Sequence, residues 1–305
     1  MAFAAFGSST KQVNNQPTKT GKVVIALLTP GLLYLGLFFL TPLFSLIMVS
    51  LEVPDPNGYG YAQYVPAFEV ANYAAVIQEY LPHILRSFGY ALVATIFALL
   101  ISYPLAYFIG VKARSRPLLQ KLMLTLVIAP FFISFLLRTL AWKQLFSNES
   151  WIVTTLQSWH ILAPDQYVVG TPFMVIFGLT YNFIPFMTLP LYTSLERLDI
   201  RYLEAGADLY ASPARVFRKV TLPLSMPGII SGTLLTFIPI AGDYVNASGD
   251  FLGSSQTAMM GNAVEANYLG FNDYPSASAL SVLLMGVILI LVSVYVRRSG
   301  TEDLL

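Results

Sequence analysis

The chain has 305 residues, of which 56% are hydrophobic and only 11% are charged. Because soluble domains carry about 25% charged residues, this composition excludes an ordinary water-soluble protein and indicates a membrane protein. The sequence contains no cysteine, which excludes disulfides, thiolate metal sites and cysteine nucleophiles. His83 and His160 lie far apart in sequence, so we expect no metal site, and the net charge of +1 does not point to nucleic acid.

Long charge-free stretches divide the chain. Residues 1–22 have no apolar period and are expected to form a disordered cytoplasmic tail. Residues 23–51 exceed the 7–15 apolar residues of a signal peptide and predict an N-terminal accessory transmembrane helix, followed by an external loop at 52–83. Five further spans are predicted at about 87–111, 122–141, 172–195, 222–242 and 275–296. The chain would then end in a cytoplasmic tail, residues 297–305. In the third span, Arg138 is expected to snorkel towards the headgroups or to pair with an acidic residue outside.

The basic residues predict the orientation of these spans. Fourteen of the 17 Lys and Arg residues fall on one side of a six-span arrangement. Since basic residues are retained in cytoplasmic loops, both termini are expected to be cytoplasmic. The segment between the fourth and fifth spans, residues 200–223, is then cytoplasmic as well. The predicted fold is an all-α polytopic membrane protein.

The segment 200–223 carries the most specific pattern in the chain. An apolar face at i, i+4 and i+7 formed by Leu203, Ala207 and Tyr210 predicts one short helix. Ser212 followed by Pro213 predicts the start of a second, with the hydroxyl as N-cap and proline in the first turn. An amphipathic loop lying at anionic headgroups would account equally well for these features alone.

The residues of this segment resemble the EAA loop of permease subunits from binding-protein-dependent ABC importers. That pattern is E-A-A-x3-G-x9-I-x-L-P, and the sequence fits its spacing from Glu204 to Pro223 without a gap. The resemblance covers residues 84–296 as a type I permease core. Several flanking segments are similar to spermidine/putrescine permeases: Arg201–Glu204, Ile238-Pro239, Gly242–Val245, Leu252-Gly253, Met260-Gly261 and Asp273–Ala279. Iron, sulfate and thiamine permeases share the same scaffold, so they stay open as alternatives.

The resemblance implies that the loop is a coupling helix that docks on a cytoplasmic ATPase. The residues implied in docking are Glu204, Ala205, Gly206, Leu209, Tyr210, Ala211, Leu222 and Pro223. Two of them depart from the family pattern. Gly206 stands where alanine is preferred, and Tyr210 stands at the glycine. Because a left-handed conformation would cost tyrosine about 1–2 kcal/mol, we expect the corner to be displaced to Ala211-Ser212.

The resemblance also implies partners. These are a second permease subunit, expected to be a homologue in a heteromer, two copies of an ABC ATPase and an external substrate-binding protein, all acting at the bacterial cytoplasmic membrane with its lipid. The chain has no GxxxxGK[ST] phosphate loop. ATP and magnesium are therefore expected in the partner ATPase, and this chain is expected to hold no cofactor and to catalyse no reaction.

A polycationic substrate needs carboxylates and aromatic faces along its path. Asp243, with Tyr244 and Asn246, is the best candidate from sequence, although a carboxylate at the outer water interface is an equal alternative. Tyr181 and Asn182 could line a cavity or make hydrogen bonds within the bundle. Trp142 could contribute to the path or only anchor the span at the interface.

Two other classes of function remain to be compared with the sequence, a membrane-embedded enzyme and a secondary transporter. A membrane-embedded enzyme needs paired acids, a Ser/His set or a metal cluster inside its spans, and the long apolar runs contain no acid or histidine. A secondary transporter would have no use for an ATPase-docking loop. The sequence therefore favours the permease subunit of an ATP-driven importer, most consistent with polyamines.

Overall fold

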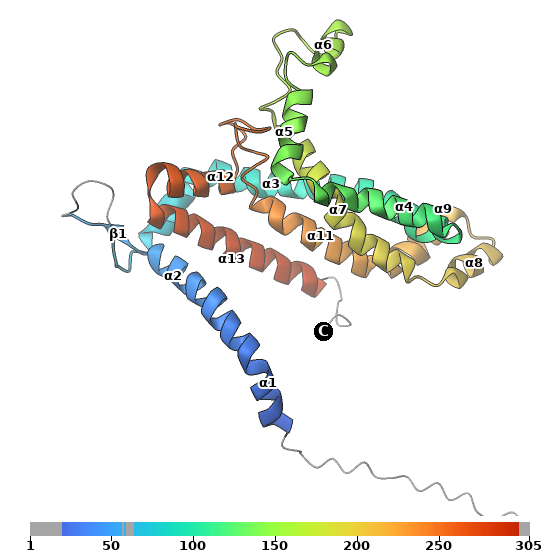
Figure 1. The fold of residues 1–305 in the computed structure, drawn as a ribbon, viewed down its shortest axis with the longest axis horizontal. Helices are drawn as coiled ribbons and strands as arrows, with labels where there is room; N and C mark the ends of the chain where they lie inside the picture. Colours follow the sequence, from blue (N-terminus) through green and yellow to red (C-terminus); the bar gives the residue numbers. More distant parts are fainter. Residues whose placement is uncertain (1–19, 57, 59–63, 299–305) are drawn as a thin grey trace, which may run out of the picture. The chain divides into compact units, whose positions relative to one another are not determined.

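The computed structural model describes residues 20–56, 58 and 64–298 and divides the chain into two units, Met1–Leu46 and Ile47–Leu305 (Figure 1). The tails predicted at 1–22 and 297–305 therefore lie mostly outside the described residues. Helix begins already at Thr20 and continues to Arg298 at the other end.

The first unit is helical. It contains α1 (Thr20–Leu35), the π-helical turn η1 (Gly36–Leu40) and most of α2 (Thr41–Val49). The π turn lies immediately before Pro42, which has no amide hydrogen to continue the regular ladder, and the Thr41 amide donates instead to the Gly36 carbonyl. Residues Val24–Val49 are long and apolar enough to cross a membrane.

The second unit contains the remaining elements. The helices are α3 (Ala71–Tyr107), η2 (Phe108–Lys112), η3 (Ala113–Ser115), α4 (Pro117–Ile128), η4 (Ala129–Phe132), α5 (Phe135–Leu145), α6 (Trp151–Ser158), α7 (Pro172–Glu196), α8 (Ile200–Asp208), α9 (Pro213–Val216), η5 (Phe217–Thr221), α10 (Leu222–Leu224), α11 (Met226–Ala241), α12 (Met260–Glu265), η6 (Ala266–Phe271) and α13 (Tyr274–Arg298). Strands β1 (Val53–Pro54) and β2 (Tyr64–Val65) pair antiparallel, with Val53 opposite Val65.

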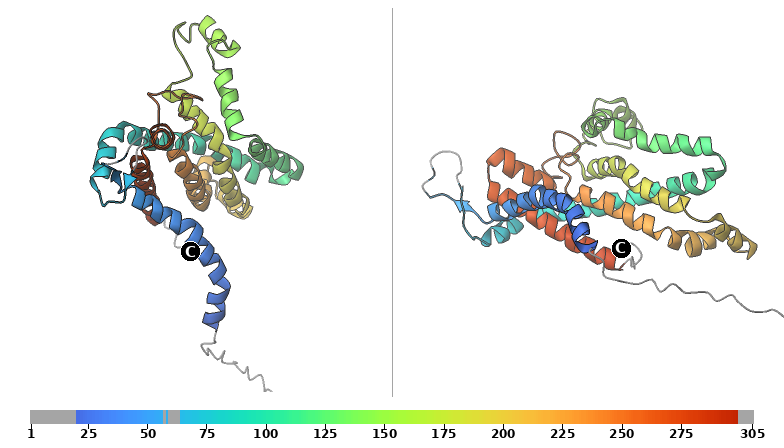
Figure 2. Two further views of the ribbon diagram at one scale, coloured as in Figure 1. Left: turned by 60° about the vertical axis from the view of Figure 1, so that its left-hand side comes forward. Right: turned by 60° about the horizontal axis from the view of Figure 1, so that its bottom comes forward.

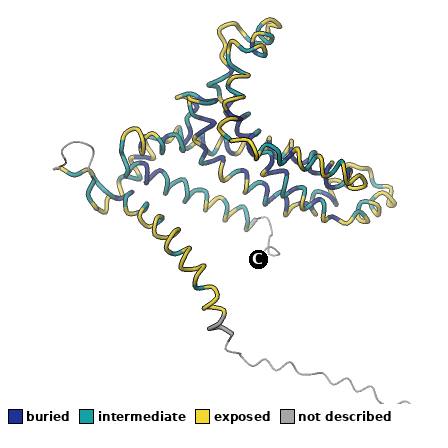
Figure 3. The backbone as a smooth tube through the Cα atoms, viewed as in Figure 1, coloured by how far each residue is buried: buried dark blue, intermediate teal, exposed yellow. Residues whose placement is uncertain are grey.

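Helix α7 lies at the centre of the second unit, packed against α3 and α11 (Figure 1 and Figure 2). Small residues permit this packing. An added Cβ at Gly232 of α11 would lie 2.8 Å from Met187 Sδ, and one at Gly228 would lie 2.9 Å from the Pro190 carbonyl. Gly228-x3-Gly232 is thus a small-residue motif of the kind that brings membrane helices into close contact. Buried residues follow these three helices, whereas the first unit is exposed along its length (Figure 3).

Part of the segment predicted as an external loop, residues 52–83, is helical and belongs to α3. The structure is helical from Ala71, because Val76 packs on Met260, Ala263 and Leu280 and so gives this polar stretch a buried face. A search for charge-free runs cannot find such a segment, since Glu79 and Arg86 interrupt it.

The predicted third and fifth spans are each bent. Pro117–Phe132 and Phe135–Leu145 meet at 93°, and Pro213–Leu224 and Met226–Ala241 meet at 65°. The first bend follows from extended backbone at Ile133 and Ser134, just after Pro130. Among the described residues, four helices can cross a membrane unbroken, and up to six can cross if each bent pair is one span.

Candidate functional site

The segment 200–223 forms a helical corner. Asp199 caps α8, since its Oδ1 accepts from the Arg201 amide at 3.0 Å. At the other end Tyr210 adopts a left-handed conformation with φ 54°. The Tyr210 amide donates to the Ala207 carbonyl at 2.9 Å and the Ala211 amide to the Gly206 carbonyl at 3.1 Å. These two bonds make a Schellman motif, which closes α8 at Tyr210.

The prediction that the corner moves to Ala211-Ser212 is therefore wrong. The two closing hydrogen bonds hold Tyr210 in the strained conformation, and its side chain meets no obstacle because it is 98% exposed. Helix α9 begins at Pro213 as the sequence predicts, although the Ser212 hydroxyl makes no capping bond.

Gly206 has a packing role at this corner. A Cβ added there would lie 2.9 Å from Cγ2 of Val216, which belongs to α9. Because Val216 is β-branched and stiff at χ1, it has little freedom to move away. Glycine at position 206 thus lets the second helix of the corner pack directly on the first.

The side chains of the corner divide by exposure. Glu204 and Ala205 are exposed, and Leu209 and Tyr210 are 81% and 98% exposed. Pro223 is also exposed, whereas Gly206, Ala211 and Leu222 are partly buried. Two large apolar side chains beside a carboxylate are thus presented on one short helical corner. We call the exposed set Glu204, Ala205, Leu209 and Tyr210 the corner face.

Aromatic contacts attach the corner to the helical core. The Phe217 ring meets the Tyr103 ring edge-on at 5.5 Å and the Tyr107 ring at 6.5 Å. The hydroxyl oxygens of Tyr103 and Ser225 lie 2.7 Å apart, at the bend between α10 and α11. No role in the site was predicted from the sequence for Phe217, Tyr103 or Ser225.

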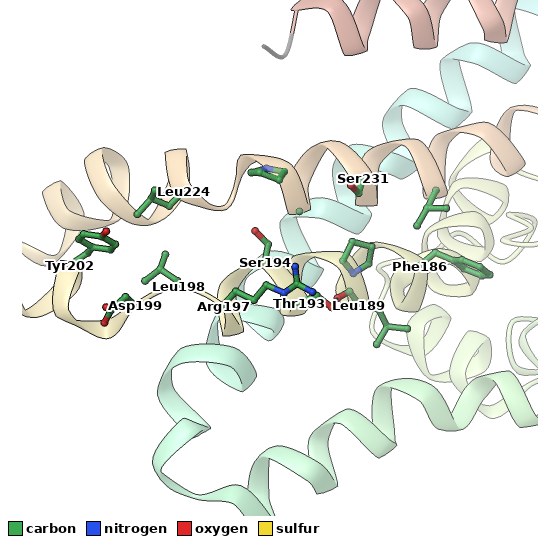
Figure 4. A pocket seen from close by; sticks show the side chains of 14 residues that line it. Phe186, Leu189, Thr193, Ser194, Arg197, Leu198, Asp199, Tyr202, Leu224 and Ser231 are labelled. Atoms are coloured by element: carbon green, nitrogen blue, oxygen red, sulfur yellow. Dashed lines mark hydrogen bonds between the residues drawn. The ribbon is translucent and has the colours of Figure 1, made fainter. Parts of the chain in front are cut away.

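A cavity of about 870 Å³ lies between α7, α8 and the α10–α11 bend (Figure 4). Arg197, Asp199 and Tyr202 line it towards α8, while Phe186 and Leu189 line its other end. It therefore joins a charged mouth at the corner to an apolar wall on α7. This cavity could not be predicted from the sequence, because its walls come from separate segments.

At the other end of α7 and α11 four polar side chains form one hydrogen-bonded set, here called the polar chain: Asp243, Asn246, Asn182 and Thr139. Asn246 donates from its backbone amide to Asp243 Oδ1 at 2.7 Å and from Nδ2 to Asp243 Oδ2 at 3.0 Å. Asn182 Nδ2 donates to Asn246 Oδ1 at 3.1 Å and to Thr139 Oγ1 at 3.2 Å. All four residues are buried.

Asp243 is therefore not a surface carboxylate at the water interface. Burial raises its pKa to about 6, and the donors from Asn246 and the backbone amides of Ala247 and Val245 oppose this rise. The loop containing Asp243 packs closely on α7, since a Cβ at Gly178 would lie 2.7 Å from Asn246 Oδ1.

The other pathway candidates lie in two places. Trp142 packs edge-on against Tyr181 at 5.1 Å and against Phe177 at 4.8 Å, so it joins α5 to α7 within an aromatic cluster. Tyr244 is half exposed and its carbonyl accepts from Asn262 Nδ2 at 2.6 Å. The structure thus joins Asp243, Asn246 and Asn182 directly, and places Tyr244 outside the polar chain.

The position of Arg138 differs from the prediction that it snorkels towards the headgroups or pairs with an acidic residue outside. It is 91% buried on α5, and its Nε has no hydrogen-bond partner. Its guanidinium carbon lies 5.9 Å from the centre of the Phe135 ring. Arg138 lies in the first turn of α5, just after the 93° bend, and is largely buried against an aromatic ring. Arg138 and Thr139 are the residues of this region that sequence reasoning did not assign to a site.

Among the described residues, no group of three or more His, Cys, Asp or Glu side chains is placed to hold a metal ion.

Comparisons with known proteins agree on one family. The family model described as "Binding-protein-dependent transport system inner membrane component" matches residues 102–299. The spermidine/putrescine transport system permease protein PotB of Haemophilus influenzae is 33% identical over 290 residues, covering 95% of this chain and 96% of that protein. PotB of Escherichia coli K12 is 32% identical over 284 residues, covering 92% of this chain and 95% of that protein.

The fold has solved counterparts. A chain from the crystal structure of a bacterial ABC transporter involved in the import of the acidic polysaccharide alginate has a TM-score of 0.70. It is 16% identical in sequence, and the match covers 93% of this chain and 97% of that one. At this identity the likeness concerns the fold alone.

Proposed function

Because the chain belongs to the family of inner-membrane components of binding-protein-dependent transport systems, we propose that it carries polyamines such as spermidine and putrescine into the cell. It is the permease subunit of an ABC importer and leaves ATP hydrolysis to a separate ATPase. The observation that carries the substrate assignment is the 33% identity, over 95% of the chain, to a permease named for spermidine and putrescine.

The chain is a multi-pass inner-membrane protein, and our proposal for its topology has six spans with both termini in the cytoplasm. The accessory span is the helix Val24–Val49, and each bent pair counts as one span of the permease core, residues 84–296. The asymmetry of Lys and Arg supports this orientation. The exposed hydrophobic side chains of the helices would face lipid or other subunits.

The ATPase docks on the corner face in this proposal. A helix presenting apolar anchors fits a groove in a partner, and Glu204 would meet a basic residue there. Phe217 and the Tyr103–Ser225 contact would transmit movement of the corner to α3 and to the bend at α11. ATP and magnesium would be bound by the ATPase, of which two copies are expected.

A second permease subunit completes the pathway, and we expect a homologue of this chain. Closure of the ATPase dimer on ATP would move both corners and switch the paired permeases from inward- to outward-facing. An external substrate-binding protein would deliver the polyamine. The polar chain, with Trp142 and Tyr181 beside it, would contribute this chain's share of the substrate path.

Uptake of labelled substrate tests the assignment. Cells lacking the gene should lose uptake of spermidine or putrescine, and the restored gene should return it, while uptake of ferric iron, sulfate and thiamine stays unchanged. Unchanged polyamine uptake, with loss of one of the other solutes, would replace polyamines by that solute and leave the permease class intact.

Purification of the chain from its native membrane tests the class itself. The chain should bring down an ABC ATPase and a second permease. Full transport by the chain alone in vesicles, without an ATPase, would contradict the proposed function.

A further inference from the structure

The hydrogen bonds of the polar chain fix the direction of both amides. An ionised carboxylate only accepts, so the amide nitrogen of Asn246 must face Asp243 and its oxygen must face Asn182. Asn182 therefore presents its nitrogen to Asn246. Thr139 gives an independent check, because its hydroxyl donates to the Phe135 carbonyl at 3.0 Å and so accepts from Asn182.

This direction leaves the Asn182 oxygen facing away from the polar chain. Asn182 is 98% buried, and its Oδ1 has no hydrogen-bond partner. The residue lines a cavity of about 400 Å³ at the α4–α5 bend. The same cavity is lined by Arg138, whose buried Nε also lacks a partner. Two residues that each carry a buried atom without a partner, an acceptor on Asn182 and a donor on Arg138, thus line one cavity.

The walls of this cavity are aromatic. Its lining includes Phe131, Phe135, Phe183 and Phe186. Their rings form a continuous series, with centroids 6.3 Å apart for Phe135 and Phe183, 5.6 Å for Phe183 and Phe186, and 5.1 Å for Phe186 and Phe131. Phenyl faces attract cations within about 6 Å of their centres. The guanidinium of Arg138, 5.9 Å from the Phe135 centroid, already occupies this environment.

The aligned amides extend the influence of Asp243 to the cavity. Asn246 donates to the carboxylate and accepts from Asn182, so both amide nitrogens point towards Asp243 along the series. Such chains of hydrogen bonds polarise one another, so the negative charge of Asp243 makes the Asn182 oxygen a better acceptor. Asp243 itself can remain buried while it acts there.

We propose that this aromatic cavity binds one protonated amino group of the transported polyamine, which donates to Asn182 Oδ1 and competes with the guanidinium of Arg138 for the phenylalanine walls. The inference rests on the proposed polyamine function. Arg138 is a tethered cation that fills the site when it is empty of substrate. It weakens substrate binding and thereby favours release. Phe131 and Phe132, both substantially exposed, lie at the rim through which substrate enters.

Transport kinetics of the complete importer in vesicles, with labelled spermidine, test this site. Arg138→Met removes the competing cation and should lower KM on the order of tenfold, because a unit charge a few ångströms from an ammonium has an effect of at least this size. Arg138→Lys keeps the charge and should leave KM within about twofold of wild type. Asn182→Leu removes the acceptor and should raise KM on the order of tenfold.

The double variant Arg138→Met/Asn182→Leu distinguishes a binding site shared by these two residues from a structural role of either one. With the acceptor gone, removal of Arg138 should lower KM far less than it does alone. ATPase activity of each complex reports assembly. If Asn182→Leu does not assemble, Phe183→Leu takes its place as the test variant: it removes an aromatic wall and should raise KM. Wild-type uptake of spermidine with unchanged KM in Arg138→Met and Phe183→Leu overturns this site alone. Absence of spermidine uptake by wild type overturns the proposed function as well.

Discussion

The corner face lies on α8, just after the end of α7, and the polar chain joins α5, α7 and the loop after α11; polar groups are exposed in the first and buried in the second. At the corner, Glu204 and Tyr210 project from the surface. In the polar chain, Asn182 lies 14 residues before the end of α7 at Glu196, a helical rise of roughly 20 Å. Asn182 and Asp243 are buried and bonded to other side chains. An exposed, strained corner suits contact with another protein. A buried hydrogen-bonded set suits a smaller ligand or an internal change of state.

Reversing the charge of the corner face should have the largest effect. Glu204→Lys is expected to weaken the ATPase contact by about 2–5 kcal/mol, since it replaces one member of a charge pair by a like charge. ATP-dependent uptake should then be lost while the subunit still folds. Binding of the purified ATPase to the permease pair measures this. Glu149→Lys, at an exposed site between α5 and α6, is the matched control and should bind normally. Retained stimulation of ATP hydrolysis in Glu204→Lys would argue against docking here.

The polar chain should respond to pH instead. Because burial raises the pKa of Asp243 from 3.8 to about 6, the carboxyl is ionised at neutral pH, and folding favours its protonated form only as pH falls below about 6. The Asp243 carboxyl contributes fully to the free energy of unfolding below about pH 4. This contribution, about 3 kcal/mol, is lost as pH rises through 6. Uptake should run the other way, rising as the carboxylate ionises.

Thermal unfolding between pH 4 and 7 and spermidine uptake between pH 5 and 7.5 measure the two slopes. Asp243→Asn should flatten them, whereas Asp250→Asn, at an exposed position in the same loop, should retain them. If Asp243→Asn keeps the wild-type pH profile of uptake, the polar chain has no part in cation transport.

A change at Tyr210 separates strain from contact at the corner. Tyr210→Gly relieves the left-handed conformation and should stabilise the corner by about 1–2 kcal/mol, yet it removes an exposed ring. Tyr210→Ala removes the same ring and keeps most of the strain. Both should lower ATPase stimulation to a similar degree, and only the glycine variant should raise the unfolding temperature. Equal unfolding temperatures would contradict the assigned strain.

The smallest expected effect is at Gly206. Gly206→Ala gains about 1 kcal/mol of helix propensity, but its Cβ would lie 2.9 Å from Val216 Cγ2. The two effects oppose each other, so the net change in stability should stay within about 1 kcal/mol. Adding Val216→Ala removes the contact and should make the same substitution stabilising. Thermal unfolding of the four combinations measures this coupling.

Hydrophobic periodicity and charge predicted much of the fold because they indicate which segments can lie in lipid and which must contact water. Apolar runs indicated long helices such as α7 and α13, and the turn signal at Ser212-Pro213 located the start of α9. These features are local. The bends at Ile133–Ser134 and Ser225 were not predicted, since a bent helix keeps the same apolar composition as a straight one.

The sites were predicted only in part for a similar reason. The chemistry of a polycation suggested Asp243 with Asn246, and Asn182 in a different span, but the hydrogen bonds between them depend on close packing between α7 and the loop at 242–259. Arg138 was misplaced because its burial follows from the bend at the start of α5. The prediction for Tyr210 rested on the intrinsic cost of a left-handed backbone conformation for tyrosine, and the two hydrogen bonds of the corner offset this cost.

Contact between the corner and the ATPase can be measured directly, because the chain contains no cysteine. Leu209→Cys places one thiol on the corner face, and Leu269→Cys places one in η6; the native side chains are 81% and 71% exposed. Each thiol is labelled with a benzophenone maleimide in the assembled importer and irradiated. The docking account predicts an adduct with the ATPase from Leu209→Cys and none from Leu269→Cys. An ATPase adduct from Leu269→Cys, with none from Leu209→Cys, would contradict it.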